Sequence, residues 1–236
     1  MKLSFQDERV LAVVAHPDDA ELLCAGTLGR AKADGAAIGI AVLCKGDGGQ
    51  PPKPIRALGA VRRREMAAAA GLLGAELFCG GVPDGALADD RPTRLVLVEV
   101  YRRFRPSLVL AHGPGDYHAD HRATAALAEA ASWLCASRGQ KTQSPPLARQ
   151  PELWWMDTVG MSGFEPGFYV DVSSFLALKE EMLACHRSQI ARGSNGDFLP
   201  LVELMRLQVR ARGAQARVAA AEAFRAYHAL KRTRAW

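Results

Sequence analysis

The sequence predicts a Rossmann-like α/β fold, in which a mostly parallel sheet lies between helices in three layers. Short apolar runs alternate with longer segments of helical periodicity along the first half of the chain. This alternation is typical of right-handed βαβ units, whose parallel strands are covered on both faces. The 236 residues, 49% of them hydrophobic, suffice for one such domain with its own core.

The expected elements follow one another in βα order. Four apolar runs predict buried strands, at residues 9–15, 37–44, 75–80 and 107–113. Amphipathic or Ala-rich segments predict helices at residues 20–35, 55–74, 91–106 and 119–137. The tripeptide Pro-Asp-Gly at 83–85 predicts a turn. Residues 9–137 are therefore expected to form the catalytic core.

The remaining residues are expected to complete the same domain. Residues 138–151 are polar and rich in proline, which favours a surface loop over a linker between domains. The pattern after them predicts strands within 152–159 and 167–173, a helix at 174–189 and a long terminal helix from about Phe198. We therefore expect a single domain over residues 1–236, completed by residues 152–236.

Composition favours a soluble cytoplasmic protein. The N-terminus has no secretory signal, and no apolar stretch is long enough to span a bilayer, so no membrane association is expected. The five cysteines are scattered, and all but Cys185 lie among apolar neighbours, which predicts buried free thiols in a reducing compartment. The net charge of +5 owes much to residues 206–234, which we interpret as a solvated helix face. Without a recognisable binding motif or interleaved aromatics, no nucleic-acid partner is expected.

Two polar clusters stand where predicted strands end. His16, Asp18 and Asp19 follow the first strand, and the segment AHGPGDYHADHRAT (111–124) follows the fourth. In open parallel sheets, ligands bind at the carboxyl ends of the strands, beside a topological switch point. The two clusters are therefore expected to meet there.

A divalent cation would explain why two carboxylates are neighbours at this place. His16 and Asp19 offer one nitrogen and one oxygen ligand, and His118 or His121 offers a third. Three protein ligands and a water are typical of catalytic zinc, although Fe²⁺, Co²⁺ or Mn²⁺ accept similar donors. Asp18, Asp120 and the second histidine of the pair are then available for proton transfer and oxyanion stabilisation.

Each cluster taken alone also has a structural interpretation. The HPDD segment (16–19) resembles a turn followed by a helix cap, and HADH (118–121) resembles a polar helix start. Two such clusters at equivalent strand ends of one sheet favour the metal site.

The two motifs, AHPDDAE (15–21) and HADH (118–121), resemble those of the PIG-L/LmbE-like family of zinc-dependent N-acetylglucosaminyl deacetylases. The resemblance covers most of the chain and includes CKGDGG (44–49), the Arg-x-x-Glu of 62–65 and residues 170–189. It implies a zinc-dependent N-deacetylase, a hydrolase of linear amide C–N bonds, whose partner is a small N-acetylated aminosugar.

The resemblance also implies a role for each residue of the first cluster. His16 and Asp19, together with His121 of the second cluster, would bind zinc. Asp18 would be the general base that activates a water molecule and later protonates the amine.

Further roles follow for the second cluster and for the long helix between the clusters. His118 would stabilise the oxyanion or act as the acid, and Asp120 would orient His118. Arg62 would contact substrate hydroxyls or a phosphate. The alternative for Arg62 is an ion pair with Glu65, one helical turn away on an exposed face.

Other polar residues have weaker assignments. Tyr117 directly precedes His118, unlike the catalytic tyrosine of some family members, which favours a position in the cleft wall. For His112 and Asp116 we favour loop hydrogen bonds over the orientation of a ligand. His186 is expected at the cleft rim or packed at the surface, and His228 at the surface.

Three alternatives remain open from the sequence. The protein is a deacetylase, a metal-dependent amidase of another amide such as a thiol conjugate, or a metal- and sugar-binding homologue without turnover. The arginines at 62–64 favour an anionic group on the substrate. A homo-oligomer is compatible with the resemblance, because members of the family often assemble.

Overall fold

One seven-stranded sheet runs through the computed structural model, which describes residues 4–192 and 199–228. Its strand order is β3-β2-β1-β4-β5-β7-β6. Strands β1 to β5 are parallel, whereas β7 runs antiparallel to both β5 and β6. The strands are β1 Arg9–Val14, β2 Ala37–Cys44, β3 Glu76–Val82, β4 Leu108–His112, β5 Glu152–Met156, β6 Phe168–Asp171 and β7 Ala221–Ala226. The predicted Rossmann-like class is confirmed.

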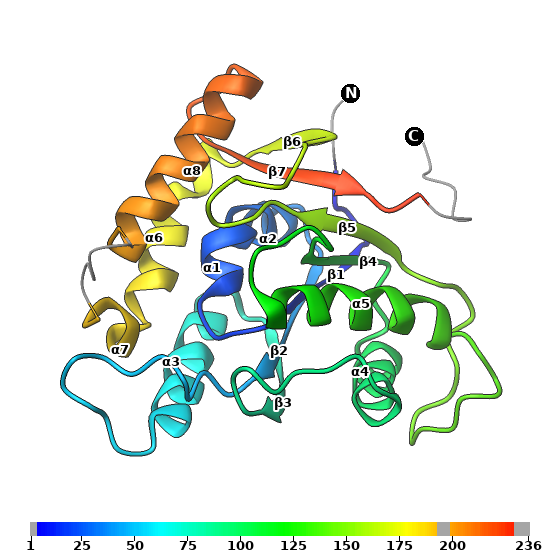
Figure 1. Cartoon of the computed structure of the whole chain (residues 1–236). Helices are drawn as coiled ribbons and strands as arrows, with labels where there is room; N and C mark the ends of the chain where they lie inside the picture. The colour runs from blue at the N-terminus through cyan, green and yellow to red at the C-terminus, as the bar shows by residue number, and fades with distance from the viewer. Residues whose placement is uncertain (1–3, 193–198, 229–236) are drawn as a thin grey trace.

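Helices cover both faces of this sheet, so the molecule has three layers (Figure 1). Two separate cores result because alternate side chains of a strand point to opposite faces. Val10, Ala12 and Val14 of β1 belong to one core, and Leu11 and Val13 to the other. The helical elements are α1 Asp19–Leu23, α2 Ala25–Ala33, α3 Leu58–Leu73, α4 Arg91–Phe104, α5 Ala119–Leu134, the 3₁₀ turn η1 Ser173–Phe175, α6 Leu176–Ala184, α7 Arg187–Ile190 and α8 Leu201–Ala216.

The topological switch point lies between β1 and β4. The chain fills one side of β1 with β2 and β3 and then crosses to the other side with β4. Val13 pairs with Ala111 in this parallel register, so the residues that follow each strand emerge side by side. The fold thus brings the two polar clusters to one edge.

The predicted terminal helix from about Phe198 is wrong in its second half. Phe198 lies outside the described residues; α8 begins at Leu201 and ends before Arg217, which adopts a left-handed φ of 59°. Residues 221–226 form β7, which pairs with β5 and β6. Ala-rich composition favours a helix locally, but burial between two strands overrides that preference. Arg212 of α8 is also buried against Asp157, rather than on a solvated face.

The predicted helix at 20–35 is two helices. Glu222 of β7 accepts hydrogen bonds from the backbone N–H groups of Gly26 and Thr27, at 2.9 and 2.7 Å. Its carboxylate therefore caps the start of α2 and separates it from α1 at Cys24. The buried ammonium of Lys179 in α6 pairs with the same carboxylate and donates to Leu22 O. A sequence window cannot show a cap that comes from a strand nearly 200 residues later.

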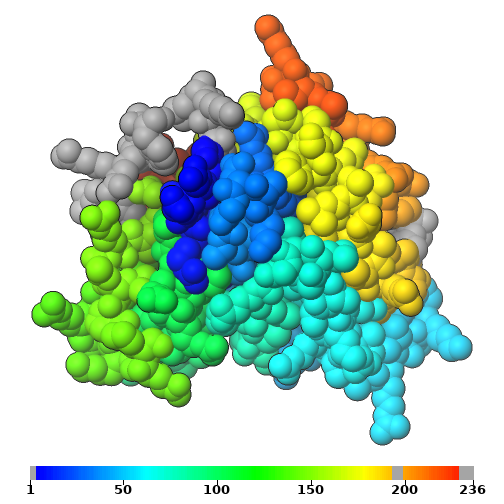
Figure 2. Space-filling view, turned by 180° about the vertical axis from the view of Figure 1, so that it is seen from behind, coloured from blue at the N-terminus to red at the C-terminus, as the bar shows by residue number. Residues whose placement is uncertain are grey.

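The predicted helix at 174–189 is also interrupted, since η1, α6 and α7 follow each other with a break at Cys185 and His186. The predicted helix at 55–74 begins only at Leu58. On the back of the molecule, the blue α2, the cyan α3 and the yellow α6 form one continuous surface (Figure 2). Within residues 4–192 and 199–228, none of the helices has the length and apolar character needed to cross a membrane.

The Lys179–Glu222 pair can be tested by substitution. The variant Lys179→Met leaves a buried carboxylate without its cation, so we expect the free energy of unfolding to fall by about 3–5 kcal/mol in chemical denaturation. Lys53→Met, at an exposed loop position, is the control and should change stability by less than about 0.5 kcal/mol. An equally small loss for Lys179→Met would contradict the assigned role of the pair.

Candidate active site

The turn between β1 and α1 separates two neighbouring carboxylates. Asp18 has a left-handed φ of 103°, a conformation that aspartate tolerates better than most residues. Its Oδ2 accepts a hydrogen bond from Arg62 Nη2 at 2.8 Å. Asp19 Oδ2 instead accepts from the backbone N–H of His16 at 2.7 Å and faces the histidines. The two carboxylates therefore have different partners.

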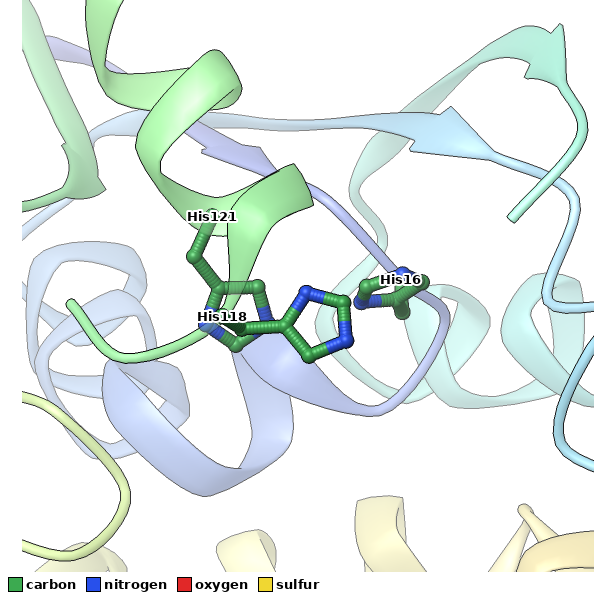
Figure 3. A group of neighbouring side chains, drawn as sticks. All are labelled: His16, His118 and His121. Carbon is green, nitrogen blue, oxygen red and sulfur yellow. The ribbon is translucent and has the colours of Figure 1, made fainter. Parts of the chain in front are cut away.

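The start of α5 brings the second cluster against this turn. His118 occupies the N-cap position of α5, and His121 lies in its first turn. The rings of His16, His118 and His121 gather at one place, from the β1–α1 turn and from the start of α5 (Figure 3). Ring centroids are 4.9 Å apart for His16 and His118, and 5.4 Å apart for His16 and His121. The expected meeting of the two clusters is observed.

The donors around Asp19 are spaced as a cation would require. Asp19 Oδ2 lies 3.5 Å from His16 Nδ1 and 3.5 Å from His121 Nε2. A tetrahedral zinc ion with ligands at about 2.1 Å has ligand–ligand separations of about 3.4 Å. Ring nitrogens of His16, His118 and His121 also lie within 4.8 Å of one another. The residues present therefore fit a metal ion of the zinc type.

The electrostatics of these side chains point the same way. Burial lowers the pKa of His16, but contacts with Asp19 and Cys44 outweigh it and raise that pKa to about 11. Burial likewise opposes the charge on His121, yet Asp19 and Asp116 raise its pKa to about 9. Burial raises the pKa of Asp19, but His121 and His112 hold it well below its usual range. This group of side chains thus favours positive charge at its centre.

His112 and Asp116 support this group and are more than loop residues. His112, at the end of β4, is fully buried, and its Nε2 lies 3.2 Å from Asp19 Oδ2. Its ring stacks on that of His121 at 3.9 Å. Asp116 Oδ2 lies 3.0 Å from His121 Nδ1. Asp116 does make the expected loop hydrogen bond, since its Oδ1 accepts from the backbone N–H of His118 at 2.9 Å. The favoured interpretation of loop hydrogen bonds alone is incomplete, because both residues also contact the expected ligands.

Asp120 contacts a different histidine from the one expected. Its Oδ2 lies 3.0 Å from His16 Nε2 and accepts from the backbone N–H of Gly85 at 2.8 Å. Towards His118 it offers only its backbone N–H, which donates to Nδ1 at 3.2 Å. The prediction that the Asp120 carboxylate orients His118 is therefore wrong, because this carboxylate contacts His16.

Arg62 is a buried residue, so its interpretation as an exposed partner of Glu65 is wrong. Its guanidinium is 3% exposed and binds Asp18 Oδ2, Pro17 O and Gly46 O. Glu65 instead accepts from the backbone N–H and the hydroxyl of Ser188, at 2.8 and 2.6 Å. The Arg-x-x-Glu motif therefore joins α3 to the β1–α1 turn and to α7. Contact of Arg62 with substrate stays a prediction.

Three other assignments can be compared with the structure. His186 is fully buried, 3.4 Å from the buried carboxylate of Glu21, so both expected positions for it were wrong. Tyr117 is 56% exposed, and its ring packs at 6.0 Å from that of His118, as a wall residue would. His228 is exposed, as expected.

Sequence reasoning missed two contributors to the site. Cys44, at the end of β2, contacts His16 rather than only apolar neighbours. Asp84 of the 83–85 turn accepts from the N–H groups of Gly46 and Gly48 at 2.7 and 2.9 Å. The Asp-Gly dipeptide signalled a turn, but its partners lie almost 40 residues away and have no local signal.

Comparison with known proteins agrees with this geometry. The profile of the family described as PIG-L, GlcNAc-PI de-N-acetylase, matches residues 11–132, slightly more than half of the chain, and the match includes both clusters. The chain belongs to the PIG-L family.

Individual PIG-L relatives and structures differ in their stated activities. The chain is 28% identical over 196 residues to a 4-oxalmesaconate hydratase of Pseudomonas putida, covering 76% of this chain and 73% of the relative. It is 26% identical to a 1D-myo-inositol 2-acetamido-2-deoxy-alpha-D-glucopyranoside deacetylase of Mycobacteroides abscessus, over 85% of this chain and 88% of the relative. The conserved protein TT1542 of Thermus thermophilus has a crystal structure with 36% identity and a TM-score of 0.80, which covers 97% of this chain and 100% of that one.

Proposed function

We propose that this PIG-L protein is a zinc-dependent cytoplasmic hydrolase that removes the N-acetyl group from an N-acetylated aminosugar. The observation that carries the proposal is that Asp19 Oδ2 lies 3.5 Å from a ring nitrogen of His16 and 3.5 Å from one of His121, next to Asp18 at the switch point of the sheet. A PIG-L relative over 85% of this chain is a deacetylase of an acetamido sugar, which supports the substrate class.

His16, Asp19 and His121 would hold the metal. Two imidazoles and one carboxylate suit zinc, and Fe²⁺, Co²⁺ or Mn²⁺ accept the same donors. When bound, the ion supplies a Lewis acid that polarises the acetyl carbonyl and lowers the pKa of water. Asp120 would orient the ring of His16 through a hydrogen bond of 3.0 Å to Nε2, and Asp116 lies 3.0 Å from His121 Nδ1 as its charge partner.

In this proposal, Asp18 accepts the proton of the attacking water. Burial raises the pKa of this carboxyl group, and the Arg62 guanidinium partly offsets the increase. A carboxylate with a raised pKa is a better proton acceptor, and it can return the proton to the leaving amine. The hydrogen bond from Arg62 also fixes one carboxylate oxygen in place.

In this proposal, His118 stabilises charge on the acetyl oxygen. Burial and the positive charges on His121 and His16 lower its pKa, which favours the neutral ring. Since Nδ1 accepts from the backbone N–H of Asp120, the proton of the neutral ring resides on Nε2. That N–H is then free to donate to an oxyanion as it develops.

Hydration of an unsaturated acid is the second candidate, because a hydratase is 28% identical in a match that covers 76% of this chain. Both reactions need an activated water, but only deacetylation releases an amine and acetate. Incubation with N-acetylglucosaminides, followed by mass spectrometry for loss of one acetyl group, tests the proposal. Loss of absorbance from a conjugated oxo-acid without acetate release would favour the hydratase. No turnover of the oxo-acid or of any amide, including thiol conjugates, would favour a binding protein.

Replacing Asp18 tests its assigned role. Asp18→Asn keeps the size of the side chain but removes the proton acceptor, so we expect acetate release to fall by about 10²–10⁴-fold. Metal content, measured by elemental analysis, should remain that of the unmodified protein, because Asp18 is not among the proposed ligands. Asp89→Asn, at an exposed position, is the matched control. Full activity in Asp18→Asn would remove Asp18 from the mechanism.

The charge of Arg62 should influence how kcat/KM depends on pH. Its guanidinium lowers the pKa of Asp18, so Arg62→Gln should raise that pKa. Activity needs ionised Asp18, and the acidic limb of kcat/KM against pH should therefore move to higher pH. Arg63→Gln, at the exposed neighbouring position, should leave the limb in place. A raised KM with an unmoved limb would instead assign Arg62 to substrate binding.

A further inference from the structure

The imidazole of His16 faces two separate sets of metal-binding atoms. Its Nδ1 lies 3.5 Å from Asp19 Oδ2, on the side of His121. Its Nε2 lies 3.0 Å from Asp120 Oδ2. A neutral imidazole has one unprotonated nitrogen, so it can serve one cation at a time.

Cys44 belongs to the second set. Its thiol sulfur, a ring nitrogen of His16 and a carboxylate oxygen of Asp120 all lie within 4.8 Å of one another. Cys44 is 3% exposed and Asp120 is 1% exposed. Thiolate, imidazole and carboxylate are all zinc ligands, and a thiolate adds preference for softer ions.

The fold holds these three side chains together through fixed backbone contacts. Cys44 closes β2, and its N–H donates to Ala15 O at 2.8 Å, which places it beside the residue that precedes His16. Asp120 lies in the first turn of α5 and accepts from the N–H of Gly85 at 2.8 Å. The second set is therefore assembled from β1, β2 and α5 by the same sheet that assembles the first.

We propose that His16, Cys44 and Asp120 form a second cation position that takes soft divalent ions and competes with the catalytic metal for His16. Binding releases the thiol proton to solvent and leaves the thiolate as a ligand. A soft ion such as Cd²⁺ should enter this position, whereas Mn²⁺ and Mg²⁺ should not. The competition rests on the proposed function, because it assumes that His16 holds the catalytic metal. The second position itself does not depend on that assumption.

Cadmium binding to the metal-stripped full-length protein tests the position directly. Cd²⁺ should produce the ultraviolet charge-transfer band of a cadmium thiolate, and Cys44→Ser should abolish it. Cys79→Ser, which removes an exposed thiol, is the control and should keep the band. His121→Ala should also keep it, because His121 belongs only to the first set.

Three spectroscopic outcomes would overturn the proposal. A band that survives in Cys44→Ser, or no band in the unmodified protein, would show that Cys44 does not bind the ion. A band lost in His121→Ala would show one merged site. Neither readout requires turnover, so the position can be established even if the protein is not a deacetylase.

Competition for His16 is tested by displacement of zinc. In equilibrium dialysis of zinc-loaded protein, Cd²⁺ should expel zinc from the unmodified chain. In Cys44→Ser, the same loss of zinc should need at least about tenfold more Cd²⁺ than in the unmodified chain. The reason is that removal of a residue that only supports a metal ligand already weakens metal affinity by about 10–100-fold, and Cys44 is proposed to be a ligand itself. Identical displacement curves, together with a Cys44-dependent band, would contradict the shared use of His16.

Discussion

The central constraint on this protein is electrostatic: buried carboxylates and imidazoles meet at one end of the sheet and favour positive charge between them. Asp19, Asp116 and Asp120 each lie within 3.5 Å of a histidine nitrogen. Without a metal, protons on His16 and His121 must supply that charge, which is why their pKa values rise. A divalent cation would replace those protons and supply the positive charge that the neighbouring carboxylates require.

The rest of the fold positions this group. The β1–β4 register aligns the two clusters, and the left-handed turn at Asp18 directs one carboxylate to Arg62 and the next to the histidines. Arg62 and Glu65 lie on the same helix and hold the β1–α1 turn and α7, respectively. Lys179 and Glu222 join α6, α2 and β7 behind α1. The left-handed turn at Asp18 and the strand β7 thus both help to position the side chains of the site.

The local sequence pattern predicted the parallel strands, because a run of apolar residues identifies a buried strand without reference to the rest of the chain. It also predicted that the two clusters meet, because both follow parallel strands whose carboxyl ends lie at one edge of the sheet. It failed where distant partners decide. β7 is Ala-rich and became a strand through pairing with β5 and β6, and the break at Cys24 depends on Glu222. The contact of Asp120 with His16 rather than His118 depends on side-chain directions at a helix start. The residue types of the site were predictable, but their pairing was not.

The most direct test of the proposed metal centre is anomalous X-ray diffraction at the zinc absorption edge, from crystals of the protein loaded with one equivalent of zinc. We expect a single anomalous peak in contact with His16, Asp19 and His121, with Asp18 beside it and outside the ligand set. A peak elsewhere, or His16 and His121 directed into separate cavities with no shared ion, would contradict the proposed centre.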